Sequence, residues 1–166
     1  MKRVFLMSVA LLVASAAYAQ DSQEVRWRRI AGVITAVNVD NPVGQISAGT
    51  FPWSARGGNA RVNLSTGAAA FDVDGLVIDG TMFSGTPGPI TAVTGTLVCD
   101  VGTNNESTHD TKAVPLSATG NADFSGQIAG IPYSCVNPLF LIRIAQPAGA
   151  AGRWIATGAE RTGGTQ

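Results

Sequence analysis

Histidine and cysteine are scarce in this sequence, although many enzyme motifs depend on one or the other. The 166 residues contain one histidine, His109, and two cysteines, Cys99 and Cys135. They form no CxxC, HExxH or other spacing typical of a zinc site. The P-loop, the GxGxxG loop and the GxSxG elbow of serine hydrolases are absent too. These absences argue against most common enzyme classes, although carboxylate chemistry stays open.

Positive charge is also in short supply. Only 13% of the residues are charged, and 11 basic residues balance 11 acidic ones. Lys2 and Arg3 lie at the very start, and Lys112 is the one other lysine. Nucleic acids are bound by clustered lysines and arginines, so we expect no nucleic-acid partner. A weakly charged surface also protects poorly against self-association, which therefore stays open.

No hydrophobic run is long enough to cross a membrane comfortably. The apolar stretch from 4 to 14 follows two basic residues and precedes Ala-Tyr-Ala at 17–19. A basic start, a short apolar stretch and a small-x-small triplet are the parts of a secretory signal peptide. We therefore predict that residues 1–19 are cleaved off before Gln20. The mature protein is then secreted or periplasmic, with no transmembrane segment.

The two cysteines suit an oxidising compartment. An even number of cysteines in an exported chain is typical of disulfide pairing. A bond between Cys99 and Cys135 would contribute roughly 3 to 4 kcal/mol in the chain-entropy view. Metal ligation or a reactive thiol is the alternative, and no neighbouring Cys or His supports it. The sequence thus predicts one structural disulfide.

Long helices are not expected, because 20 glycines accompany abundant Ala, Thr and Val. Strand-like stretches recur instead between turn signals, and Ala69, Phe71 and Val73 alternate with polar neighbours as in a half-buried strand. The expected strands are 28–37, 60–64, 69–79, 91–99, 112–118, 121–128, 137–145 and 152–160.

This pattern predicts an all-β fold of one domain, an antiparallel β-sandwich of eight or nine strands. A flattened barrel is the alternative. The domain is expected to span 26–161, after a short polar leader at 20–25 and before a flexible tail at 162–166.

Two expected hairpins resemble each other. VNLSTGAAAF at 62–71 and VPLSATGNADF at 114–124 share Val-x-Leu-Ser, a Thr-Gly turn, and an alanine and a phenylalanine after it. Each combines a turn glycine suited to positive φ with a returning strand. The likeness is explained either by a duplication, with one hairpin in each sheet, or by two independent hairpins of the same design.

The polar run from 97 to 114 gathers the histidine and several acids. Asp100, Glu106 and Asp110 carry oxygen ligands that Ca²⁺ prefers, although the spacing differs from an EF-hand and such residues also fill ordinary loops. His109 beside Asp110 is a candidate general base, with a solvated loop histidine as the alternative. We favour a twelve-residue connection without a cofactor, anchored at Cys99.

Two aspartates and one arginine lie within expected strands. Asp72 and Asp74 project from the same face, roughly 7 Å apart, and paired carboxylates at such distances serve glycoside hydrolysis. A solvated strand face explains them with fewer assumptions. Arg143 interrupts LFLIRIA, and if buried it needs a carboxylate partner. We expect it instead at the strand end or a solvent edge.

The tryptophans are the remaining candidates for binding. Trp27, Trp53 and Trp154 each lie close to arginines, and Trp53 is followed by Arg56. Exposed on a β-surface, Trp53, Trp27 and Arg56 would form a platform for a sugar ring or a protein partner. Capping the core is the alternative.

The sequence thus favours an exported, non-enzymatic module that acts through surface binding or extracellular or envelope assembly. A carbohydrate-binding module that uses exposed tryptophans is the second hypothesis. A secreted hydrolase that uses Asp72 or Asp74 is the third. No sequence feature identifies the protein or glycan partner.

Overall fold

A computed structural model describes residues 23–36 and 39–163, so the expected signal peptide at 1–19 lies outside the described residues. Within these ranges the chain is all-β, with one short 3-10 turn, η1 (Pro147–Gly149). The strands are β1 (Glu24–Gly32), β2 (Trp53–Ser54), β3 (Gly57–Asn63), β4 (Ala68–Asp74), β5 (Val77–Ile78), β6 (Ala92–Cys99), β7 (Ser107–Asp110), β8 (Val114–Pro115), β9 (Ala122–Gln127), β10 (Leu139–Ala145) and β11 (Ala151–Gly163).

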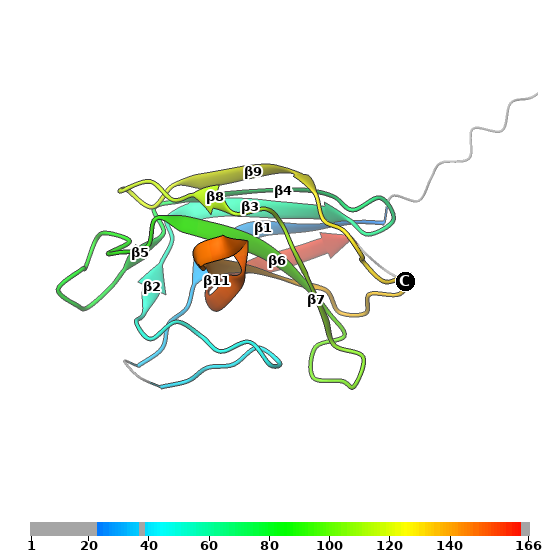
Figure 1. Ribbon diagram of the computed structural model, residues 1–166, viewed down its shortest axis with the longest axis horizontal. Helices are drawn as coiled ribbons and strands as arrows, with labels where there is room; N and C mark the ends of the chain where they lie inside the picture. The colour runs from blue at the N-terminus through cyan, green and yellow to red at the C-terminus, as the bar shows by residue number, and fades with distance from the viewer. Residues whose placement is uncertain (1–22, 37–38, 164–166) are drawn as a thin grey trace, which may run out of the picture.

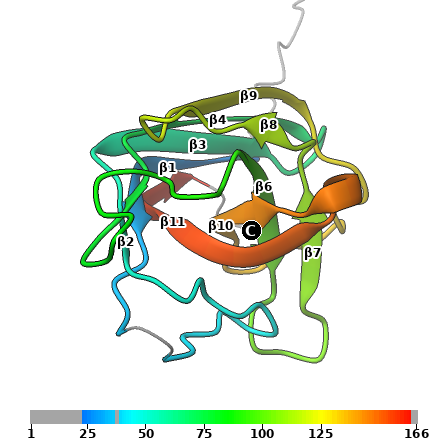
Figure 2. The same ribbon diagram turned by 60° about the vertical axis from the view of Figure 1, so that its left-hand side comes forward.

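Nine of these strands form one antiparallel sheet. Its order is β7-β6-β10-β11-β1-β3-β4-β9, and β8 pairs with another stretch of β6. The strands β2 and β5 form a separate two-stranded sheet. The large sheet curls until its two halves face each other (Figures 1 and 2). The predicted antiparallel all-β fold is confirmed, and its two layers are halves of one continuous sheet.

Aromatic rings fill the space between the two layers. The ring centroid of Phe71 on β4 lies 5.8 Å from that of Phe124 on β9 and 5.7 Å from that of Phe140 on β10. Phe140 in turn lies 5.5 Å from Trp27 on β1. Gly95 on β6 leaves room for these rings, because a Cβ there would lie 2.7 Å from Phe140 Cζ and 2.8 Å from Phe71 Cε1. The core therefore depends on a glycine opposite bulky rings.

The outward faces of the two layers differ. In the open layer, which we define as β1, β3, β4 and β9, exposed and buried residues alternate along β4, as in a strand with one wet face. In the covered layer, β6, β10 and β11, every β6 residue from Val93 to Cys99 is buried. Segment 39–52 lies on the side of this layer that faces away from β3, β4 and β9 (Figures 1 and 2). It pairs with β11 through an Ala48–Trp154 bridge.

Some predicted boundaries were wrong. β1 begins at Glu24, inside the expected leader, and ends before the expected limit at 37. The expected strand 69–79 is divided at Gly75, which has φ +62°. The connection expected at 100–111 contains β7, which pairs with β6. Its sequence STHD has no apolar alternation, so only that pairing reveals it as a strand.

No helix among the described residues is long and apolar enough to cross a membrane. β11 reaches Gly163, two residues into the stretch expected to be a flexible tail.

Candidate functional site

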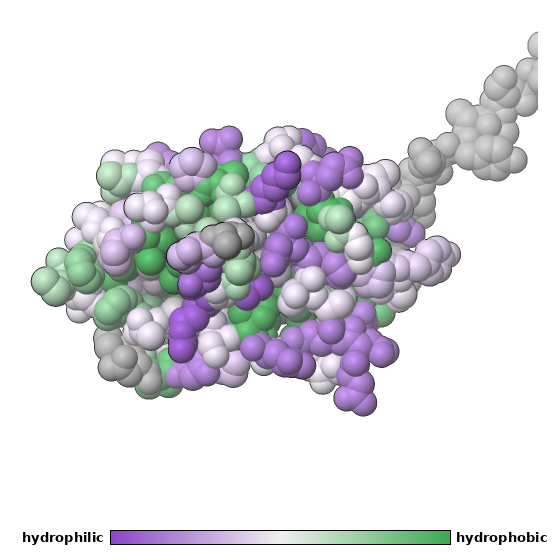
Figure 3. Space-filling model, viewed as in Figure 1, coloured by the Kyte–Doolittle hydropathy of each residue, from purple (hydrophilic) through white to green (hydrophobic). Residues whose placement is uncertain are grey.

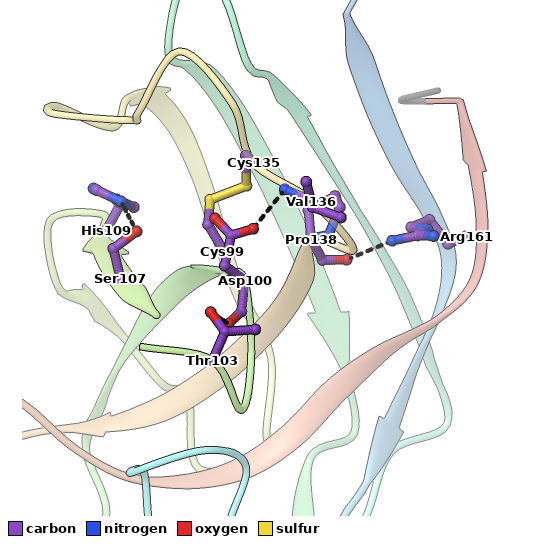
Figure 4. The surroundings of a disulfide bond; sticks show 9 residues. All are labelled: Cys99, Asp100, Thr103, Ser107, His109, Cys135, Val136, Pro138 and Arg161. Carbon is purple, nitrogen blue, oxygen red and sulfur yellow. Dashed lines mark hydrogen bonds between the residues drawn. A yellow bond between two sulfur atoms is a disulfide. The ribbon is translucent and has the colours of Figure 1, made fainter. Parts of the chain in front are cut away.

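The disulfide anchors the base of the polar run, as the sequence predicts. Cys99 at the end of β6 is bonded to Cys135, and both residues are buried (Figure 4). Asp100 donates its backbone N–H to the Val136 carbonyl at 3.0 Å, and its side chain accepts from the Val136 N–H at 3.3 Å. Asp100 has φ +55°, so two hydrogen bonds hold a backbone conformation that a non-glycine residue adopts at a cost.

Asp100, Glu106 and Asp110 do not converge on a cation. Glu106 accepts from the Gln45 N–H at 3.0 Å and the Gly102 N–H at 2.8 Å. Asp110 instead accepts from the Thr96 hydroxyl at 2.5 Å. Among the described residues, no three His, Cys, Asp or Glu side chains group closely enough to hold a metal ion. The three acids instead accept hydrogen bonds from backbone and side-chain donors in different directions, so this arrangement gives the calcium hypothesis no support.

Glu106 is a link between two loops, a role that its place in the sequence did not reveal. The loop between β6 and β7 projects from one end of the molecule as part of a hydrophilic region (Figures 1 and 3). By accepting from Gln45, the carboxylate of Glu106 joins this loop to segment 39–52. A Cβ on Gly44 would lie 2.1 Å from Glu106 Oε2, so the glycine is required for this approach.

His109 and Asp110 point in different directions, because successive residues of a strand alternate between its faces. His109 Nε2 lies 3.0 Å from the Ser107 hydroxyl (Figure 4). Asp110 Oδ1 instead lies 3.6 Å from Arg143 Nη1, on the other face of β7. The acid–histidine pair required of a catalytic triad is not formed, and the histidine is half-buried on β7 and not on a loop.

The tryptophans cap and fill the core. Trp27 is 1% exposed, Trp53 2% and Trp154 5%. Since an aromatic platform must present a ring face to the ligand, the platform of Trp53 and Trp27 is not formed in this structure. Arg56 is exposed and pairs with Asp74 at 2.7 Å. It lines a hollow of about 570 Å³ with other residues, namely Ser54, Gly75, Val77, Gly85, Thr86, Ala118 and Thr119.

Arg143 is a half-buried anchor within β10, not an edge residue. Its side chain is 13% exposed, and it donates from Nε to the Gly152 carbonyl at 2.6 Å and from Nη2 to the Ala151 carbonyl at 2.7 Å. Burial lowers the pKa of the guanidinium from its ordinary value, while the nearby Asp110 carboxylate acts in the opposite direction. The carboxylate partner expected for a buried arginine is therefore present.

A polar cleft of about 400 Å³ opens beside Arg143. Arg153 also borders it and donates to the Ala48 carbonyl at 2.8 Å. Both arginines thus use donors to hold the backbone of β11 and segment 39–52. The arginines beside the cleft are thus explained by these structural hydrogen bonds, without a bound ligand. Its other lining residues are Gln45, Ile46, Ser47, Ile144, Gln146 and Gly152.

The outward face of the open layer collects charges from four strands, and we call it the charged face. On its β1–β3 half, Arg26 pairs across the strands with Arg61. Arg28 continues the same face of β1, and the three arginines border a hollow of about 340 Å³. On its β4–β9 half, Asp72 pairs across the strands with Asp123. The charged face consists of Glu24, Arg26, Arg28, Asn59, Arg61, Ala68, Ala70, Asp72, Asp123, Ser125 and Gln127.

Three charges of this face have no ion pair among the described residues. Arg26 contacts Glu24, and Asp72 accepts a hydrogen bond from the Asn59 amide. No ion pair joins Arg28, Arg61 or Asp123 to another side chain in the part of the chain that the structure describes. All three side chains are exposed. The face thus has positive charge at one side, negative charge at the other, and room for a charged partner.

The sequence indicated part of the charged face. Arg26 and Arg28 in VRWRR are two residues apart, which places them on the same face of a strand. The spacing of Asp72 and Asp74 predicts paired carboxylates on one strand face, and the structure places Asp74 beside Arg56. Neither stretch shows which strands become neighbours, so the grouping of arginines from β1 and β3 was missed.

Comparison with protein-family models, with curated proteins and with solved structures found no match to this chain.

Proposed function

We propose that this protein is an exported, non-enzymatic all-β module that acts through its surface, in binding or in assembly outside the cytoplasm. One observation carries the proposal: the charged face presents unpaired arginines and an unpaired aspartate on a regular sheet. Charges arranged in this way set the specificity and orientation of an encounter with a partner. The Cys99–Cys135 bond is compatible with an oxidising compartment, as export requires.

The two other hypotheses lack such support. Carbohydrate binding by Trp53 and Trp27 requires exposed rings, and both rings are buried. Hydrolysis by Asp72 and Asp74 requires two carboxylates positioned on either side of the same glycosidic bond. Asp72 instead accepts a hydrogen bond from Asn59, and Asp74 forms an ion pair with Arg56. No observation favours either activity over the surface-acting module.

Site-specific photo-crosslinking in the producing cell tests the proposal. A photoreactive amino acid replaces Ser125 on the charged face, or Ala113 on the exposed stretch before β8 as the matched control. We expect a crosslinked species from position 125 and none from position 113, and a processed N-terminus at Gln20 in the recovered protein. Two outcomes would contradict the proposal: an absence of crosslinks from the charged face, or a protein that stays in the cytoplasm with residues 1–19 still attached.

A further inference from the structure

The arrangement of charges on the charged face is self-complementary. Its positive side lies on β1 and β3, and its negative side lies on β4 and β9, in one continuous antiparallel register. From this we infer that the partner of the charged face is a second copy of this chain, packed face to face across a two-fold axis parallel to the strands. The inference rests on the proposed function and names its partner.

The direction of the axis follows from the layout of the charges. A two-fold axis parallel to the strands, between β3 and β4, places β1 of one copy over β9 of the other and β3 over β4. Positive and negative sides then coincide twice, as an isologous interface requires. An axis perpendicular to the strands would instead place β1 over β1 and oppose arginines to arginines. Like charges in such positions disfavour association.

The strand register sets the individual contacts. The pairing of β1 with β3 ends at Trp27 and Ala60, and just beyond it Arg28 and Asn59 border the same hollow. Asn59 pairs with Asp72, and Asp72 with Asp123. Rotation about the axis brings Arg28 opposite Asp123 of the second copy, and Asn59 opposite Asp72. The next row holds Arg26, Arg61, Ala70 and Ser125, and it brings Arg26 opposite Ser125. Two of the unpaired charges, Arg28 and Asp123, thus become partners.

Small side chains on β4 and β9 allow the two faces to approach. Ala68 is exposed and Ala70 half-buried on β4, and Ser125 is exposed on β9. Sheets that pack face to face lie about 10 Å apart. Four strands of this length present roughly 400 Å² per copy, which is below the size of a stable interface. The dimer is therefore expected to be weak and sensitive to salt.

Charge-reversal variants test the inference in the purified protein. Analytical ultracentrifugation over a concentration series is expected to show a monomer–dimer equilibrium at low salt, weakened about tenfold or more in about 0.5 M NaCl. Arg28→Glu with Arg61→Glu gives the face a net negative charge, and Asp72→Arg with Asp123→Arg gives it a net positive charge. Each variant alone is expected to be monomeric, and an equimolar mixture of the two is expected to dimerise.

Controls separate this pairing from other effects. Lys112→Glu reverses one positive charge in the stretch between β7 and β8, outside the charged face, and is expected to leave the equilibrium unchanged. Circular dichroism and an intact Cys99–Cys135 bond verify that each variant is folded. A strictly monomeric parent, unchanged association in either reversed variant, or a mixture that stays monomeric overturns the inference. A crosslink from position 125 to a different macromolecule would then still support the proposed function, whereas absence of any crosslink contradicts both.

Discussion

The covered layer and the open layer are parts of one sheet, yet the outward face of the first is buried and that of the second is exposed. In the covered layer, Thr94, Thr96 and Leu141 point away from the aromatic core and are 0% exposed. In the open layer, the equivalent outward positions hold Arg61 and Asp72, both exposed. Segment 39–52 and its link to Glu106 account for the difference, because they lie against one layer only.

The two layers differ in what their outward residues contribute: those of the covered layer contribute to folding stability, and those of the open layer are available for interaction. A strand that is covered on both sides contributes apolar burial from each face, so the covered layer carries more of the folding free energy per residue. Exposed charges contribute little to folding, so the open layer is free to vary its outward residues for a partner. Changes within the covered layer should therefore lower the free energy of unfolding more than changes on the outward face of the open layer.

Truncating Leu141 in the covered layer should have the largest effect. The side chain is fully buried on the outward face of β10, and Leu141→Ala should lower the free energy of unfolding by about 3 to 5 kcal/mol. Urea denaturation followed by circular dichroism measures it. Arg61→Ala, which also truncates a long outward side chain but in the open layer, should cost less than about 0.5 kcal/mol. Equal losses in the two variants would contradict the contrast.

Removing the disulfide should come next. Cys99 lies at the end of β6, and its bond to Cys135 spans 36 residues, so reduction or Cys99→Ala with Cys135→Ala should cost roughly 3 to 4 kcal/mol. Reduction of an already alkylated or double-alanine sample serves as the control, because the reductant should then have no further effect. A thermal midpoint that is the same with and without the bond would count against its role in holding the covered layer.

Two arginines of the covered layer allow a comparison of a half-buried side chain on β10 with an exposed one on β11. Arg143→Ala removes hydrogen bonds to the carbonyls of Gly152 and Ala151 and removes the ion pair with Asp110. The expected loss is about 2 to 3 kcal/mol. Arg153→Ala is the matched control, since Arg153 is exposed and makes one such bond, and it should cost less than about 1 kcal/mol. Denaturant titration ranks the two, and a reversed order would show that β10 is held by other contacts.

Breaking the link between Glu106 and segment 39–52 should have the smallest effect. Glu106→Ala removes the acceptor for the Gln45 and Gly102 N–H groups and should cost about 1 to 2 kcal/mol. Amide hydrogen exchange should accelerate at residues 44–49 and remain unchanged on β3 and β4. Asp123→Ala on the charged face is the comparison, with no acceleration expected at residues 44–49. Faster exchange throughout both layers would show that segment 39–52 does not open independently of the rest of the domain.

Much of the fold followed from local patterns. The alternation of Ala69, Phe71 and Val73 with polar neighbours gave β4, and the pairing of Cys99 with Cys135 followed from their number and the expected compartment. The candidate sites were harder to anticipate. Asp100, Glu106 and Asp110 are close in sequence, but the strand and turn geometry points them toward different donors. A cluster along the chain is not a cluster in space.

The two similar hairpins show the same limit. Gly67 and Gly120 both adopt positive φ, +75° and +80°, as their turns require. However, the first hairpin pairs β3 with β4, whereas β8 pairs with β6 instead of β9. Phe71 and Phe124 lie directly opposite each other on neighbouring strands of the same sheet, not in separate sheets. The local turn was predictable, and the partner of each strand was not.

The sequence by itself determined the all-β class, the positions of most strands and the disulfide, because period-two patterning, turn glycines and cysteine number are local properties. Only the tertiary structure decided which strands became neighbours and which faces were covered. Long-range pairing brought Arg61 beside Arg26 and Asp123 beside Asp72, and it buried Arg143 against Asp110. Side-chain direction is fixed within a strand, whereas the neighbours that a side chain meets depend on strand order.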